Sequence, residues 1–199
     1  MKAYIERTKS VILTISPFDE LNYERTYSFT SLSLMFFFFS FTGWIWEVLI
    51  HIIEDGAIIN RGLLFGPWLP IYGFGGVLIL TLLRRWRYSP LKTFGLIVLL
   101  CGVIEYATSV ALERLFHARW WDYSDLTFNL NGRVCLEGLM IFGIGGLVFI
   151  YFVAPKLDDF LKRFGTRGRL ICSLCLIAVF SLDLVHAFMA PNMGFGITS

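Results

Sequence analysis

Charged residues are scarce in this chain of 199 residues, at 16% of the sequence. Ordinary soluble domains carry roughly 25% charged residues, and this chain also has 56% hydrophobic residues and a mean hydropathy of +0.68. The composition therefore argues against a water-soluble fold. The small net charge of +2 gives no sign of nucleic-acid binding, and we expect no nucleic-acid partner.

Several functional motifs are missing as well. The sequence contains no G-x-x-x-x-G-K-[ST] phosphate-binding loop, no G-x-S-x-G nucleophile motif and no spacing typical of metal ligands. We therefore expect no cofactor and no metal, and an ATP-driven role would need a separate cytoplasmic subunit. Among the four cysteines, Cys172 and Cys175 form a C-x-x-C that we interpret as small packing residues on a helix.

Long apolar runs are the main feature that is present. Five segments can cross roughly 30 Å of hydrocarbon as helices, and lipid leaves no partner for backbone groups outside helices or closed barrels. They predict an all-α, polytopic bundle of five transmembrane helices in one domain, residues 28–190. Residues 1–27 would be a cytoplasmic tail or a membrane-surface segment, and residues 191–199 an external tail. The five segments are residues 30–53, 63–83, 93–115, 134–154 and 170–190.

The basic residues indicate the orientation of the bundle. Most of the 17 lysines and arginines lie in the N-terminal tail, in residues 84–92 and in residues 156–169, which five crossings place on one face. The exceptions are Arg61, Arg114, Arg119 and Arg133. The positive-inside rule then predicts a cytoplasmic N-terminus and an external C-terminus.

The second predicted span contains helix-breaking residues. Pro67 and Pro70, bracketed by Gly66 and Gly73, predict that this helix is broken or kinked in its outer half. A broken helix could expose backbone groups to a cavity, with Arg61 beside its positive end. The alternative is a simple proline kink with close glycine packing. The sequence leaves both open.

Acidic and imidazole side chains gather in the outer half of four predicted helices. Charge in hydrocarbon costs several kcal/mol, so such residues usually mark a pathway or a site. We interpret them as the lining of an outward-facing acidic pocket, although each carboxylate could instead fix helix packing through a hydrogen bond. The residues are Glu47, Glu105, Glu113, Glu137, Asp183 and His186.

The predicted outer connection, residues 117–133, is rich in aromatic and polar side chains. It could anchor the membrane interface, or it could form a structured lid over the pocket, with Asn131-Gly132 as its tight turn. We favour the lid because an anchor needs no cluster of polar groups. The further candidate pocket residues, here and on neighbouring helices, are Arg61, Tyr106, His117, Arg119, Asp122, Asn131 and Arg133.

Three strings in the sequence resemble those of a known family. They are NRG-x-LFGP-x-x-PIYGFG at residues 60–75, HARWWDYS at 117–124 and NLNGR at 129–133. In these strings the chain is similar to bacterial membrane proteins of the ABC-transporter type IV, CmpB-like permease family. The resemblance implies a multi-pass protein of the bacterial plasma membrane with a permease role, and it supplies no catalytic residues.

Three functions remain in competition at this point. The leading hypothesis is a transport-related membrane protein whose acidic pocket takes a polar solute. The alternatives are a membrane enzyme acting on an outer-leaflet lipid or lipid-linked sugar, for which Asp183 with His186 or Glu113 with His117 could supply the base, and a scaffold or accessory subunit. The expected partners are the lipid bilayer, a separate ATPase subunit in the transport case, and a homo-oligomer as an open alternative.

Overall fold

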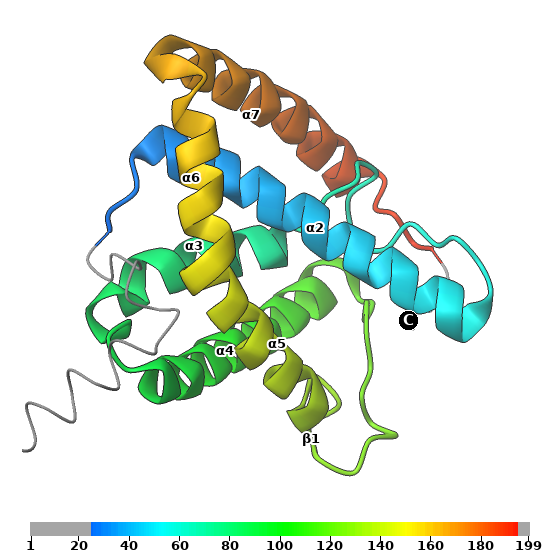
Figure 1. The fold of residues 1–199 in the computed structure, drawn as a ribbon. Helices are drawn as coiled ribbons and strands as arrows, with labels where there is room; N and C mark the ends of the chain where they lie inside the picture. The colour runs from blue at the N-terminus through cyan, green and yellow to red at the C-terminus, as the bar shows by residue number, and fades with distance from the viewer. Residues whose placement is uncertain (1–24, 195–199) are drawn as a thin grey trace, which may run out of the picture.

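The structure, a computed structural model, describes residues 25–194, so most of the predicted tail at residues 1–27 and the end of the tail at 191–199 lie outside the described part. The described chain is mostly helical, which confirms the all-α class (Figure 1). The elements are α2 (Phe29–Asp55), α3 (Pro70–Leu82), the short 3-10 helix η1 (Leu83–Trp86), α4 (Pro90–Phe116), β1 (Asn129–Leu130), β2 (Val134–Cys135), α5 (Leu136–Val148), the π-helical turn η2 (Phe149–Val153), α6 (Ala154–Lys162) and α7 (Gly165–Met189).

Four helices are long and apolar enough to cross a membrane. Their mean hydropathies run from 1.6 to 2.2, and each presents many exposed apolar side chains that only lipid would cover. The chain is therefore a multi-pass membrane protein. The four spans are Phe29–Ile53, Pro90–Phe116, Leu136–Lys162 and Gly165–Met189.

The predicted second span at residues 63–83 is helical only in part. Residues 56–69 form no helix, and α3 begins at Pro70, so it has only 13 residues. A proline in the first helical turn is favourable because its missing N–H would have no partner there, and the residue before it, Leu69, is extended with φ −112° and ψ 100°. The prolines thus replace the first part of the predicted helix with irregular chain rather than kinking a continuous one.

Glycines let α3 pack closely against α2. A Cβ added to Gly73 would lie 2.2 Å from the Ser40 hydroxyl oxygen, and one added to Gly76 would lie 2.1 Å from the ring of Phe39. Neither distance is compatible with a side chain. The close approach of two backbones through small residues is the usual packing mode of membrane helices.

The third of these four spans changes its helical type at a proline. Leu136–Lys162 runs through α5, η2 and α6, and Pro155 lies in the first turn of α6. A proline inside an α-helix removes one hydrogen bond and clashes with the carbonyl four residues earlier, and the wider π turn just before Pro155 accommodates that clash.

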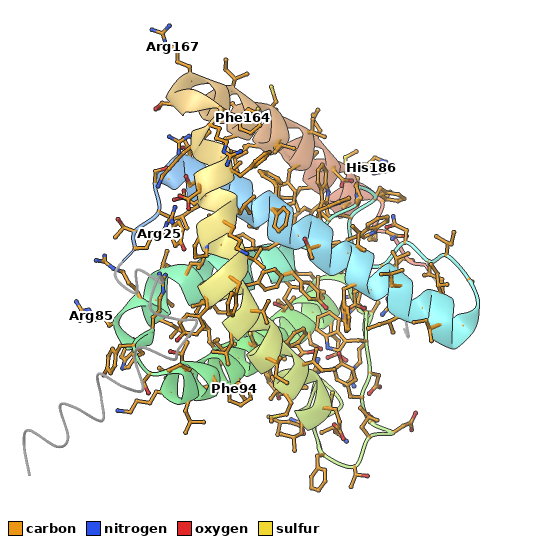
Figure 2. All side chains as sticks on the ribbon, in the orientation of Figure 1. Arg25, Arg85, Phe94, Phe164, Arg167 and His186 are labelled. Atoms are coloured by element: carbon orange, nitrogen blue, oxygen red, sulfur yellow. The ribbon has the colours of Figure 1, made fainter. Side chains whose placement is uncertain are left out.

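Arg25 and two of the basic regions lie toward one end of the bundle. Arg87 donates to the carbonyl of Arg25 at 3.2 Å, and the Tyr151 hydroxyl donates to the carbonyl of Arg87 at 2.6 Å. Figure 2 shows Arg25, Arg85 and Arg167 toward one side of the molecule and His186 toward the other. Arg25, the α3–α4 connection and the end of α6 therefore lie toward one side of the described structure, while the other basic residues of the N-terminal tail lie outside the described residues.

A buried carboxylate ties this end together. Asp158 on α6 is fully buried and accepts hydrogen bonds from Arg25 at 2.6 Å and from Lys162 at 2.7 Å. Its neighbour Asp159 contacts the same arginine but is 62% exposed. Breaking a buried ion pair leaves a charge without compensation, whereas an exposed pair contributes little.

We predict that Asp158→Asn destabilises the protein more than Asp159→Asn does. The expected loss is about 2 kcal/mol for Asp158→Asn, because a buried carboxylate that accepts from two cations is lost while Arg25 keeps Asp159, and below about 1 kcal/mol for the exposed Asp159. Thermal unfolding of the two variants in one detergent measures the difference. Equal shifts in melting temperature would show that Asp158 is not the residue that holds this end.

Candidate functional site

The connection between α4 and α5, residues 117–135, folds into a compact structure that we call the outer cap. Strands β1 and β2 pair antiparallel, with Leu130 opposite Val134. Asn131 and Gly132 form the turn with φ of 56° and 68°, the positive values that a tight hairpin requires. A Cβ at Gly132 would also lie 2.3 Å from the Asp122 carboxylate, so this position requires glycine. The predicted turn at Asn131-Gly132 is present.

Ion pairs fasten the outer cap to α4. Glu113, one turn before the end of α4, accepts from Arg119 Nε at 2.8 Å and also from the guanidinium of Arg133. Arg133 donates to the Ser109 hydroxyl at 2.9 Å as well. One carboxylate therefore holds both ends of the cap against the same helix.

Two further side chains strengthen the cap. Asn131 donates to the Tyr106 hydroxyl at 2.9 Å. Asp122 accepts from the backbone N–H of Ser124 at 2.9 Å and from its hydroxyl at 2.5 Å, and it lies 3.5 Å from Arg119. The hydrogen bonds from Ser124 first, and then the charge of Arg119, hold the pKa of the Asp122 carboxyl below its usual value.

One tyrosine of the cap reaches into the bundle. The Tyr123 hydroxyl donates to Glu105 Oε1 at 3.1 Å, and Glu105 is only 5% exposed. Burial, followed by the nearby charges of Glu105 and Glu47, raises the pKa of the Tyr123 phenol well above its usual value. Glu47 accepts in turn from the Tyr72 hydroxyl at 2.5 Å. The pairs Tyr123–Glu105 and Tyr72–Glu47, whose four members come from four different segments, therefore lie close together below the cap.

A cavity of about 420 Å³ lies beside these pairs, between α2, α3, α4, α5 and η2. Of the described residues that line it, Glu105 is the only charged one, and most of the wall is aliphatic, aromatic or glycine. Trp46, Ile141 and Ile144 form part of the wall and are 45%, 51% and 59% exposed, so the cavity opens on the apolar flank of the bundle.

The chain was compared with protein families, curated proteins and solved structures. Residues 34–188 match the family described as "Putative ABC-transporter type IV". The chain belongs to this family. No curated protein and no solved structure matches it. The region shared with the ABC-transporter type IV family includes all the described residues that line the cavity and the whole outer cap.

In this family member Asp183 has a local role at the irregular segment 56–69. Its carboxylate accepts from the backbone N–H groups of Phe65 at 3.1 Å and Gly66 at 2.8 Å, and from the Trp68 indole at 2.7 Å. His186, one turn further along α7, packs against the edge of the Phe65 ring. The carboxylate is therefore engaged by the irregular segment, which weakens the pairing with His186 that an enzyme would use.

The predicted pocket residues fall into three groups rather than one pocket. Arg61 joins the irregular segment to the cap by donating to the Trp120 carbonyl at 2.8 Å, while His117 and Glu137 are exposed near the cap. In the described part of the chain no group of three His, Cys, Asp or Glu residues is arranged to hold a metal. The cap group is Tyr106, Glu113, Arg119, Asp122, Asn131 and Arg133; the cavity group is Glu47 and Glu105; and the α7 group is Asp183 and His186.

The sequence reasoning missed three residues of the cavity region. Tyr72 partners Glu47, and Gly75 and Gly145 face the open space of the cavity from α3 and α5. The glycine-rich stretch around Gly75 could have indicated a cavity, but it indicated close helix packing equally well. Nothing in the sequence distinguishes a glycine that touches a neighbour from one that borders a void.

We predict that the outer cap loosens in acid. The pKa of Asp122 in the folded protein lies below the unfolded value near 3.9, so its ionised form stabilises the cap above about pH 4, and this contribution is lost as the pH falls through the lower folded value. Hydrogen exchange of residues 117–135, corrected for intrinsic rates, should rise below about pH 4. Asp122→Asn should loosen the cap at neutral pH and reduce the further change in acid. Asp125→Asn, a change at an exposed carboxylate in the same cap, should leave the acid response intact.

Proposed function

We propose that the chain is the membrane component of a transporter, that the cavity between α2, α3, α4 and α5 holds the transported molecule, and that the outer cap is its gate. Membership of the ABC-transporter type IV family supports the transport role. The geometry favours a molecule with a large apolar part over the fully polar solute expected from the sequence, because the cavity wall is mostly apolar.

The observation that carries this proposal is the contact between Tyr123 and Glu105. Tyr123 belongs to the cap, and Glu105 is the charged residue of the cavity wall. A molecule that reaches Glu105 from the outer face has to displace the cap. When the cap opens, Glu105 loses the hydrogen bond that the Tyr123 hydroxyl donates to it. Gate and cavity are therefore coupled by one contact.

We propose that the chain crosses the membrane five times, with a cytoplasmic N-terminus. Helix α3 is about 20 Å long at 1.5 Å per residue, too short to span the hydrocarbon alone. The irregular segment 56–69 would complete this crossing, as interrupted helices do in transporters, where non-helical backbone is tolerated when protein buries it. The shared basic end then faces the cytoplasm.

The energy source would be a separate subunit. The sequence has no phosphate-binding loop, so an ATP-driven cycle needs an ATPase that contacts the cytoplasmic end. The basic end of the bundle, where α6 meets α7, is the face available for it.

We predict that an ATPase subunit accompanies the protein through purification in a mild detergent. Mass spectrometry should identify, in stoichiometric amount, a protein whose peptides include a phosphate-binding loop. Recovery of the chain with lipids alone, in repeated preparations that preserve its fold, would contradict an ATP-driven role.

The gate can be tested through a native cysteine. Cys101 lines the cavity, whereas Cys172 and Cys175 lie on α7. Glu113→Gln should release Arg119 and Arg133, open the cap, and raise labelling of Cys101 by a membrane-impermeant maleimide severalfold. Peptide mass spectrometry separates the labelling of the individual cysteines.

The matched control is Glu137→Gln, which changes an exposed carboxylate at the start of α5. It should leave Cys101 as protected as in the unaltered protein. If Glu113→Gln makes the cap sensitive to protease and Cys101 stays equally protected, the cap does not gate the cavity.

A further inference from the structure

The wall of the cavity contains a carboxylate oxygen that lacks a partner. Glu105 Oε1 accepts from Tyr123, but Oε2 has no hydrogen-bond partner within the described residues 25–194. Glu105 is only 5% exposed and Oε2 itself is covered, so a donor in the cavity would meet this oxygen once the Glu105 side chain turns toward the open space. A buried polar atom without a partner is costly, and native structures rarely keep one unless something else satisfies it. A hydrogen-bond donor on a bound molecule would do so.

Two glycines show that the space beside Glu105 is open. A Cβ added to Gly75 on α3 or to Gly145 on α5 would find no atom within 4 Å, and both residues line the cavity. Gly75 is nevertheless buried, so the open space next to it is enclosed by the bundle. Packed helices seldom leave such a space empty, because unfilled apolar volume destabilises a core.

The size and opening of the cavity limit what it can hold. Its volume of about 420 Å³ falls within the range of roughly 300–1,000 Å³ typical of small-molecule pockets. Its opening lies on the apolar flank, at Trp46, Ile141 and Ile144. An alkyl chain would match the aliphatic wall and could enter from the bilayer. A solute that is polar over its whole surface would lose its water without compensation, because Glu105 is the one charged group in the described part of the wall.

We propose that the cavity binds a single-chain amphipathic molecule, with its alkyl chain along the walls of α3 and α5 and a hydrogen-bond-donating head group, an amine or a hydroxyl, at Glu105. This proposal rests on the proposed transport function and names the class of molecule transported. The single chain follows from the small volume, and the donor head follows from the unpartnered oxygen.

Photolabelling in lipid nanodiscs tests the proposal. The probe is a dodecylamine that carries a diazirine at the end of its chain, in nanodiscs of dioleoylphosphatidylcholine. Labelling should be saturable, should fall on the cavity-lining peptides of α3, α4 and α5, and should be competed by unlabelled dodecylamine. Dodecyltrimethylammonium has the same chain and charge but no donor, so it should compete at least tenfold less well.

Three variants separate the cavity from the head-group contact. Gly145→Leu should fill the cavity and abolish the saturable labelling, and Gly75→Val is a second filled variant in case the first does not fold. Gly95→Leu is the matched control, because Gly95 is also a helical glycine with open space around it but does not line the cavity. Glu105→Gln should keep the cavity and weaken dodecylamine binding on the order of tenfold, the size expected for a lost charge-assisted hydrogen bond.

Each contrary outcome overturns a stated part of the proposal. Unchanged labelling in folded Gly145→Leu and Gly75→Val would place the binding site elsewhere. Equal competition by dodecyltrimethylammonium, or full binding by Glu105→Gln, would remove the head-group contact. A diazirine phosphatidylcholine that labels the cavity despite excess dodecylamine would identify bilayer lipid as the occupant. The recovery of an ATPase and the protection of Cys101 do not depend on this ligand, so they can succeed when the ligand class fails.

Discussion

The constraint on which this structure depends is the need of every backbone polar group at membrane depth for a partner inside the protein. Helices meet this need within themselves. In the proposed five-crossing topology residues 56–69 also lie at membrane depth, and because they are not helical they have to find partners elsewhere. They do so through Asp183 of α7, through Asn192, which donates to the carbonyls of Asn60 and Gly62, and through the carbonyl of Ser40, which accepts from the N–H of Leu69 at 3.0 Å. Asp183, which the sequence suggested as a pocket residue, thus holds the backbone of residues 56–69 in place.

The cavity depends on the glycines of α3 and α5. Gly73 and Gly76 let one side of α3 pack against α2. At Gly75, in contrast, no atom would lie within 4 Å of an added Cβ, so this glycine borders open space. Gly146 on α5 packs against Ile97 of α4, while Gly145 beside it faces the open space. Alternating close and open glycines therefore fix the helices firmly and leave a void between them, so the void is not a sign of loose packing.

The sequence predicted the features that follow from local chemistry. Long apolar runs gave four of the spans, the prolines indicated the break before Pro70, and Asn131-Gly132 gave the turn of the cap. The distribution of the carboxylates could not be predicted, because it depends on which helices become neighbours. Glu105 and Glu113 share one stripe of α4, yet one contacts a buried tyrosine and lines the cavity while the other binds two arginines of the cap. Asp183 could be assigned to its backbone partners only once the path of residues 56–69 was known.

The placement of charge along α4 has a physical explanation. Glu113 is matched by two guanidinium groups near the end of this helix, where a salt bridge tolerates partial exposure. Glu105 lies deeper, and the side-chain donor that it has within residues 25–194 is a phenol, which is weaker than a guanidinium and uncharged. A full positive partner at Glu105 would neutralise it permanently and leave nothing for a ligand to satisfy. In the proposed gate, the Tyr123 phenol would move with the cap, so it would partner one oxygen of Glu105 and leave the other for an incoming donor. The cap would then also set how strongly the cavity binds.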